Sequence, residues 1–381
     1  MTRPPLSILS IGGATALSVL GDAVMYAVLP SYYGHIGLTP LQVGLLLSVN
    51  RWVRLASNHV AERCYRESPV EVWLVPAYLL GSLATAVYGL SKVFLILFAA
   101  RTLWGICFSF IRQAGVMTVV SSSSDAHLGE HMGVYRGISS SGWFLGMFVA
   151  GLSHDFFGFT VTLLMFSSLS FLSAPLGFLS QRGTDSARKV PLTLNVMKAD
   201  LGIMLCGFGV GIVGLGLVMS TLGLLLKEQV GVSMNFRGYT VGVATMTGLV
   251  LGIRWVLVAL GSPILGAIAD RIGRDRSIPV LFVVGAIILG LTGLPFGPFW
   301  LICGVLVLFF CETLLDTLII ARAGQQGPRW VASYVTALDF GAALGPLLGW
   351  GIAQLGLPAN LIFLTGAIFY ASGAFVSRSM K

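Results

Sequence analysis

Apolar runs of about 20 residues recur along nearly the whole chain, and short polar segments separate them. A run of this length is what an α-helix needs to cross the hydrocarbon layer of a bilayer. Inside that layer every backbone N–H and C=O group must be satisfied within the protein, so such runs fold as helices. We place twelve spans, near residues 7–33, 40–62, 70–90, 93–120, 134–154, 159–180, 200–226, 238–269, 278–294, 298–321, 331–354 and 358–377.

The composition is that of a protein surrounded by lipid. Charged residues make up 10% of the chain and hydrophobic residues 56%, whereas a soluble domain carries about 25% charged residues. The net charge of +8 comes from basic residues in short loops that form no continuous basic face. This argues against nucleic acid as a partner and makes the lipid bilayer the main surroundings of the chain.

The sequence lacks the common motifs of soluble catalysis. It holds no P-loop and no G-x-S-x-G elbow. Its five cysteines form no C-x-x-C pair, which favours buried hydrophobic roles. The segment from His127 to His131 matches the H-x-x-E-H pattern of a zinc peptidase class, but it lies in a predicted loop without a clear third ligand. We therefore expect no enzyme activity, no metal site, no cofactor and no direct use of ATP.

A repeated charged loop divides the chain into two related parts. Residues 61–66 line up with residues 269–274, 208 positions later, and each copy lies between apolar runs. The longest polar gap, residues 181–198, falls between the sixth and seventh predicted spans. We predict a six-helix bundle over residues 1–180, a linker over 181–199 and a second six-helix bundle over 200–381, an arrangement typical of carriers.

The distribution of basic residues predicts the orientation of the chain. One side of the predicted membrane has Lys92, Lys227 and Arg237 alone, and the side that holds both termini has all the other basic loop residues. Cytoplasmic loops are enriched in lysine and arginine, so we expect both termini in the cytoplasm and the chain in the plasma (inner) membrane. We expect it to act as a monomer. The basic residues on the side of the termini are Arg3, Arg63, Arg66, Arg136, Arg182, Arg188, Lys189, Lys198, Arg271, Arg274, Arg276, Arg322, Arg329, Arg378 and Lys381.

Small residues at intervals of four mark two of the predicted spans. Gly142 and Gly146 have this spacing in the fifth span, and Gly341 and Gly345, followed by Pro346, have it in the eleventh. Such spacing lets helix backbones approach closely. Because these two spans are equivalent members of the two halves, we expect packing that also allows movement, with static packing as the alternative.

Three motifs together resemble those of the major facilitator superfamily. Residues 266–276 are similar to its G-x-x-x-D-R-x-G-R-[RK] loop, residues 101–105 to its R-x-x-x-G motif, and residues 341–351 to its antiporter motif. The resemblance implies an all-α membrane protein of twelve helices in two pseudo-symmetric bundles, with spans one, four, seven and ten around a central cavity. It is greatest to bacterial drug and metabolite exporters.

The resemblance also implies a gate in the charged loop after span eight. We expect Asp270, Arg271 and Arg274 to hold the bundles together, with Asp270 bonded to the start of span eleven or to nearby arginines. Asp339, on the inner part of span eleven, is a further candidate for this latch.

Ionisable residues inside the predicted spans are candidates for function, because each costs roughly 2.5–3.5 kcal/mol at the bilayer centre on insertion scales. We expect Asp22 and Arg101 to lie at similar depth and to pair, either for proton coupling or as a structural ion pair. We expect Arg254 to be structural. The predicted substrate-binding residues are Arg51, Arg54 and Arg112 on a basic wall, with Glu312 and Asp316 opposite and Arg112 level with Asp316.

These features predict a secondary transporter that works by alternating access, driven by protons. The walls of opposite charge favour a small organic anion or zwitterion as the substrate, and export as the direction. The alternative is multidrug efflux of lipophilic compounds, which the 23 phenylalanines and 8 tryptophans favour. A membrane receptor without transport, or an intramembrane enzyme, is less well supported, because no nucleophile and base are visible at depth.

Overall fold

The computed structural model describes residues 4–124, 127–182, 201–236, 239–261 and 274–379. Its first half begins with a broken helix, composed of α1 (Leu6–Ser18), α2 (Leu20–Ala27), α3 (Leu29–Tyr32) and a 3-10 turn η1 (Tyr33–Ile36). Four continuous helices follow, and a sixth rod is made of two shorter helices. These are α4 (Pro40–Glu67), α5 (Val70–Leu90), α6 (Phe94–Ser121), α7 (Leu128–Phe157), α8 (Phe159–Phe171) and α9 (Ser173–Gln181).

The second half begins with a rod whose middle is a π-helix. This rod comprises α10 (Leu201–Val210), the π-helix η2 (Gly211–Val218) and α11 (Met219–Val230). The strands β1 (Ser233–Phe236) and β2 (Tyr239–Gly242) come next. The remaining elements are α12 (Val243–Val256), the π-helix η3 (Leu257–Gly261), α14 (Arg274–Thr292), α15 (Pro298–Gln326), α16 (Pro328–Gln354) and α17 (Asn360–Ser379).

The described residues form twelve helical rods, as the sequence predicts. Eight of them are long and apolar enough to cross a membrane, and two further apolar helices, residues 243–259 and 277–292, are shorter. The other two rods are α4 and α7, which carry more polar side chains. The all-α membrane fold is therefore confirmed for the described residues.

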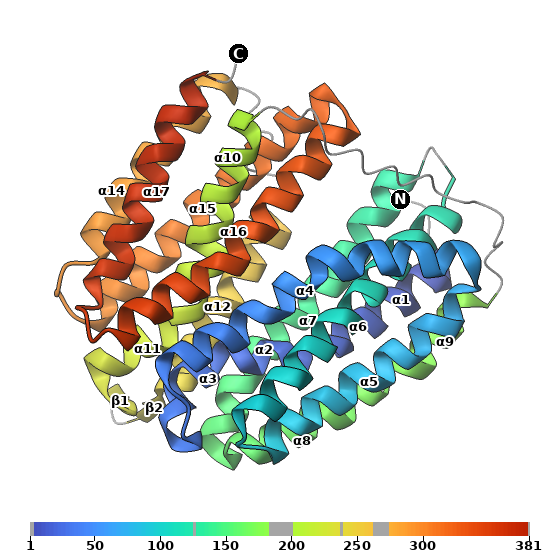
Figure 1. Cartoon of the computed structure of the whole chain (residues 1–381), viewed down its shortest axis with the longest axis horizontal. Coiled ribbons are helices and arrows are strands. Elements are labelled where there is room, and N and C mark those ends of the chain that lie inside the picture. Colours follow the sequence, from blue (N-terminus) through green and yellow to red (C-terminus); the bar gives the residue numbers. More distant parts are fainter. Residues whose placement is uncertain (1–3, 125–126, 183–200, 237–238, 262–273, 380–381) are drawn as a thin grey trace.

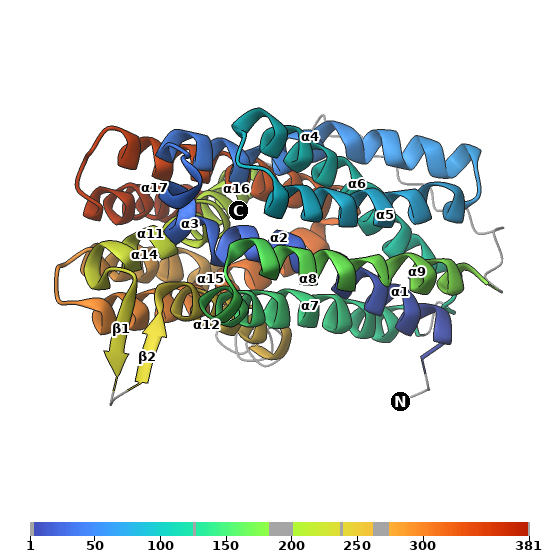
Figure 2. The same cartoon turned by 90° about the horizontal axis from the view of Figure 1, so that it is seen from below.

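A β-hairpin corrects the predicted eighth span, which was expected to begin at residue 238. β1 and β2 pair antiparallel, from Ser233 opposite Gly242 to Phe236 opposite Tyr239, and the helix begins only at Val243. Gly231 ends α11 with φ of 74° and turns the chain into the hairpin, a conformation that glycine adopts without steric cost. Figure 2 shows the hairpin standing apart from the helices.

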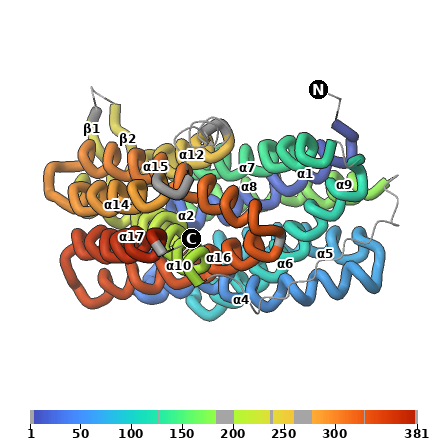
Figure 3. The backbone as a smooth tube through the Cα atoms, turned by 90° about the horizontal axis from the view of Figure 1, so that it is seen from above, coloured from blue at the N-terminus to red at the C-terminus, as the bar shows by residue number. Residues whose placement is uncertain are grey.

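The helices of the two halves converge at the hairpin and diverge toward the ends of the chain (Figure 1). The start of α1 and the end of α17 lie away from the hairpin, so we refer to a hairpin side and a terminal side. Seen from above, α7 lies beside α12 and α4 beside α16 (Figure 3). These two helix pairs are the main contacts between the halves.

Close backbone approaches join the halves near the hairpin side. A Cβ on Gly248 would collide with the carbonyl oxygen of Met147, and a Cβ on Gly44 would lie 2.8 Å from Trp350. Ser48 also donates a hydrogen bond to the carbonyl of Ala343. Farther from the hairpin, Arg54 of α4 donates a hydrogen bond to Asp339, which lies near the middle of α16.

The glycines singled out from the sequence pack helices within each half. Gly142 lies against Ala16 of α1, and Gly146 would place a Cβ 2.9 Å from Ala23 of α2. Gly341 and Gly345 lie against α10 and η2 of their own half. Pro346 differs, because its carbonyl oxygen lies 3.1 Å from the place of a Cβ on Gly44 across the interface. The close contacts of these four glycines therefore lie within the halves.

Candidate functional site

A cavity of about 210 Å³ lies within the second half, beside the interface with the first. The rods that contain η2, α12, α15 and α16 surround it. Its lining is mostly apolar but includes a cation, two carboxyls and a phenol. The lining residues are Val210, Leu215, Arg254, Trp255, Val258, Glu312, Thr313, Asp316, Ile320, Tyr334, Val335 and Leu338.

Arg254 of α12 and Glu312 of α15 form a two-pronged ion pair in this cavity. Nη2 of Arg254 donates to Oε1 of Glu312 at 2.9 Å and its Nε donates to Oε2 at 3.3 Å. The side chains are 7% and 3% exposed. The guanidinium also lies 5.3 Å from the ring centre of Trp255. A paired geometry of this kind is needed to offset the cost of burying two charges.

The π-helix η2 makes room for this pair. A Cβ on Gly214 would collide with the carboxylate of Glu312, so glycine is the residue that fits here. Short π-helical segments occur frequently at functional sites. The glycine-rich sequence of span seven thus has a specific use, which is to let the helix backbone pass close to a buried carboxylate.

Asp316 lies one turn along α15 from Glu312 and has a different partner. The hydroxyl of Tyr334, which is completely buried, donates to Oδ1 of Asp316 at 2.6 Å. Among the described residues, no cationic side chain forms an ion pair with Asp316. Its carboxyl therefore faces the cavity with a neutral donor as its hydrogen-bond partner.

Asp22 and Arg101 form a second buried pair, in the first half, and the contact is the one expected from their estimated depths. Nη1 of Arg101 bonds Oδ1 of Asp22, and its Nε donates to the carbonyl of Leu46 at 3.0 Å. Asn50 donates to the same carboxylate at 3.5 Å. The guanidinium also lies within 5.9 Å of the ring centre of Tyr26.

Asp339 of α16 joins the two halves through two arginines. Nη2 of Arg54 lies 3.5 Å from its Oδ1, and Nη1 of Arg112 lies 3.4 Å from its Oδ2. The sequence predicted that Arg112 lies opposite Asp316. It also predicted that Asp339 contacts the loop after span eight. In the structure Arg112 contacts Asp339 instead. The rotation of each helix about its axis brings these two side chains together, and depth in the membrane does not specify that rotation.

Of the other predicted site residues, Arg51 is placed by the structure and the residues of the charged loop are not. Nε of Arg51 donates to the hydroxyl of Tyr26 at 3.4 Å, so it joins the first-half cluster. Asp270 and Arg271 lie outside the described residues, and of Arg274 the backbone alone is described. The predicted gate in this loop is therefore not placed.

Three side chains around the cavity were missed from the sequence or were assigned another role. Arg254 was expected to be structural, yet it lines the cavity. Tyr334 gave no signal, since a tyrosine in an apolar helix is usual. Trp143 of α7 stacks on Trp255 of α12 across the interface, with ring centres 5.2 Å apart and an interplanar angle of 15°. The cavity is therefore next to a contact between the halves.

The family model of the Major Facilitator Superfamily matches residues 11–346. The chain therefore belongs to this superfamily, and it is an integral membrane protein of the secondary transporter class. No curated protein sequence matches it significantly.

Solved transporter structures share the fold at low sequence identity. A bacterial homologue of the human lysosomal transporter Spinster, inward-facing and occupied, has a TM-score of 0.78 at 13% identity, over 97% of this chain and 95% of the other. A POT peptide transporter in complex with alafosfalin also has a TM-score of 0.78, at 11% identity, over 99% and 94%. A POT family transporter with a thioalcohol-conjugated peptide reaches 0.75 at 13% identity, over 97% and 94%. At such identities the likeness concerns the fold.

Proposed function

We propose that this transporter carries a small zwitterion or organic anion by alternating access of two bundles, residues 1–180 and 200–381, joined by a linker at 181–199. The observation that carries the proposal is the cavity with Arg254, Glu312 and Asp316 on its walls. It offers both signs of charge within one cavity. Its volume of about 210 Å³ is below the ~300–1,000 Å³ typical of pockets for drug-sized ligands, which favours a small substrate.

The ion pair gives the substrate a way to change the protein. A substrate carboxylate would compete with Glu312 for the forked donors of Arg254, and a substrate ammonium group would approach Asp316. A ligand can shift a conformational equilibrium only if it binds the two states differently. Exchange of partners at Arg254, beside the Trp143–Trp255 stack, supplies such a difference where the halves meet.

We further propose that protons drive the transport, that the substrate leaves the cell, and that both termini face the cytoplasm. In this scheme Asp22 with Arg101 takes part in proton coupling, because a carboxylate that exchanges an arginine for another partner can change its charge during the cycle. Arg51 and Arg54, with Arg112, would form a basic wall toward the terminal side. Asp339, with the loop residues Asp270, Arg271 and Arg274, would act in gating. The protein would work as a monomer in the plasma membrane.

Flux measurements in liposomes test the proposal. The purified protein is reconstituted with an imposed pH gradient, and uptake of labelled small zwitterions, organic anions and neutral lipophiles is compared. We expect flux of a charged substrate that depends on the gradient and is lost in Glu312→Gln, while Glu67→Gln, an exposed control on the terminal side, keeps it. Binding of such a ligand with no flux in any gradient would contradict transport and favour a receptor.

Efflux of lipophilic compounds is the second candidate function. Trp255, Val258, Ile320 and Leu338 give the cavity an apolar surface, which would suit a neutral aromatic compound. The two functions differ in their need for the ion pair. Efflux of neutral dyes that continues unchanged in Arg254→Gln would favour the second candidate over the first.

A further inference from the structure

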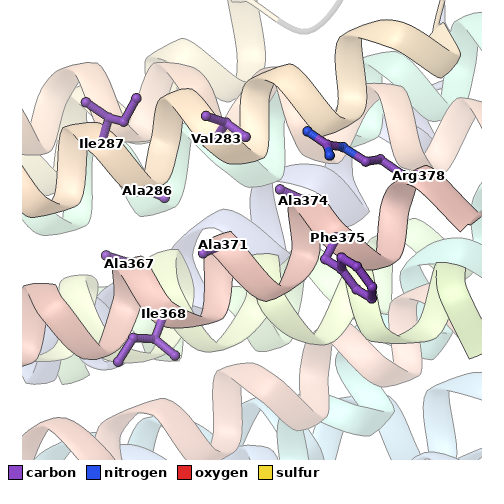
Figure 4. Close-up of a pocket in the computed structure, with 9 residues that line it drawn as sticks. All are labelled: Val283, Ala286, Ile287, Ala367, Ile368, Ala371, Ala374, Phe375 and Arg378. Atoms are coloured by element: carbon purple, nitrogen blue, oxygen red, sulfur yellow. The ribbon is translucent and has the colours of Figure 1, made fainter.

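A groove on the outside of the second half runs between α14 and α17 (Figure 4). Its volume is about 510 Å³. Ala286 of α14 and Ala367, Ala371 and Ala374 of α17 line it with methyl groups, and Ile287 and Phe375 stand along its edges. The groove is separate from the charged cavity and shares no lining residue with it.

The packing of the two helices explains the space between them. Phe282 meets Tyr370 edge to face, with ring centres 5.4 Å apart. A Cβ on Gly285 would lie 2.5 Å from the Tyr370 ring, and one on Gly373 would lie 2.7 Å from Phe282. The aromatic rings therefore fill the inner side of the contact, and the alanines leave its outer side hollow.

The edges of the groove are exposed in a way that suits lipid. Ile287 is 56% exposed and Phe375 is 80% exposed, and an integral membrane protein presents such apolar side chains to acyl chains. A continuous apolar groove of this size can hold part of one acyl chain in van der Waals contact.

The end of the groove on the terminal side carries a positive charge. Arg378, in the last turn of α17, is exposed and lines the groove, and its guanidinium lies over this end (Figure 4). Among the described residues no carboxylate or hydrogen-bond acceptor is paired with it. Basic pockets between membrane helices bind anionic lipid head groups, and Arg378 supplies one cationic group of this kind at the end of the groove.

We propose that this groove binds an anionic phospholipid, with one acyl chain along the alanines and the phosphate held by Arg378. The charge complementarity sets the choice of occupant, because the choline cation of a zwitterionic lipid offsets the attraction of its phosphate to the guanidinium, whereas an anionic lipid has no such cation. A second apolar groove, of about 410 Å³, lies between α5 and α6 and is lined by Leu83, Val87, Ile96 and Leu103 with other apolar residues and no charged one. It should accept acyl chains without regard to the head group.

Native mass spectrometry of delipidated protein tests this site. The protein is titrated with phosphatidylglycerol and with phosphatidylcholine of identical acyl chains. A basic residue near the membrane surface contributes about 1 kcal/mol, or about fivefold in affinity. We expect one site with about fivefold preference for phosphatidylglycerol, and we expect Arg378→Gln to remove this preference while weak binding of both lipids persists.

Arg182 supplies a matched control. It caps α9, which ends the first half as α17 ends the second, and its guanidinium lies 5.2 Å from the ring centre of Phe178. Arg182→Gln removes the same charge but should leave the preference unchanged. Equal binding of the two lipids by the unsubstituted protein, or an equal loss in both variants, would overturn the proposal.

Two further measurements locate the acyl chain and identify the ligand. Ala371→Leu fills the groove without a change of charge and should abolish the selective site, and Ala367→Leu does the same at a second position if the first variant unfolds. Inorganic phosphate at the lipid's concentration should not displace the lipid. Retention of selective binding in both folded leucine variants would exclude the groove as the site. Displacement of the lipid by phosphate would contradict a site that needs the acyl chain. Occupation of the groove by a second copy of the chain would contradict a lipid as its occupant.

Discussion

The two halves each bury an arginine–carboxylate pair, but they surround it differently. Arg101 is completely buried, donates to the backbone of Leu46 as well as to Asp22, and shares that carboxylate with Asn50. Arg254 gives two donors to Glu312, and both side chains line a cavity. Fractional exposure hardly distinguishes the pairs. Nη2 of Arg101 has no hydrogen-bond partner, so its surroundings do not satisfy every donor. The difference is that the second pair borders a cavity that another molecule can enter.

This difference separates a pair that holds helices from a pair that can receive a ligand. In the first half, the Asp22–Arg101 contact ties α2 to α6, and the bond to Leu46 adds α4. In the second half, the Arg254–Glu312 contact ties α12 to α15 alone. We therefore expect changes at Arg101 to affect stability most and changes at Arg254 to affect binding most.

The largest effect on stability is expected from Arg101→Gln. Removal of one partner of a buried ion pair costs about 3–5 kcal/mol, because the other charge stays buried without compensation. Thermal unfolding in detergent should show a large loss of stability, and the double variant Asp22→Asn/Arg101→Gln should recover part of it. Arg254→Gln is the matched comparison, and an equal or larger loss of stability there would contradict the distinction between the pairs.

Arg254→Gln is expected to act mainly on substrate binding. A hydrogen bond to a charged group contributes about 1.5–3 kcal/mol, which corresponds to roughly a ten- to hundredfold loss of affinity. The loss of stability should be smaller than for Arg101→Gln, because Glu312 lines a cavity of about 210 Å³, which has room for water beside the carboxylate. Calorimetric binding of the substrate found in the flux measurements checks the first expectation. Arg254→Lys should keep part of the affinity, since it retains the charge but not the forked donors.

Asp339→Asn is expected to have the smallest effect, at the contact between the halves. Both contacts of Asp339 are long, 3.4 Å to Arg112, which is 41% exposed, and 3.5 Å to Arg54, which is 11% exposed. We therefore expect a contribution of about 1 kcal/mol, the upper end for exposed ion pairs, and a shift of the populations of the two states by about fivefold. Spin labels at Val60 of α4 and Thr336 of α16, in a background without native cysteines, report the separation on the terminal side. Unchanged label distances in the variant would mean that Asp339 does not couple the halves.

The sequence predicts the helices of this fold well because the bilayer sets their length. The β-hairpin was missed, since its residues follow a long apolar run and precede another. For the candidate site, estimated depth was enough to pair Asp22 with Arg101. Depth did not find the partners of Asp339, because two residues at one level meet only if both helices turn the right face toward each other.

The π-helix η2 has a consequence for how span seven should be numbered on a helical wheel. An α-helix turns by about 100° per residue, and a π-helix, with its i→i+5 bonds, fits extra residues into each turn. The faces of α10 and α11 are therefore out of phase with a single wheel drawn through residues 201–230. Deletion of one residue within 211–218 would rotate everything on one side of it by about 100°, so the alignment of this span with any relative must keep the same number of residues there.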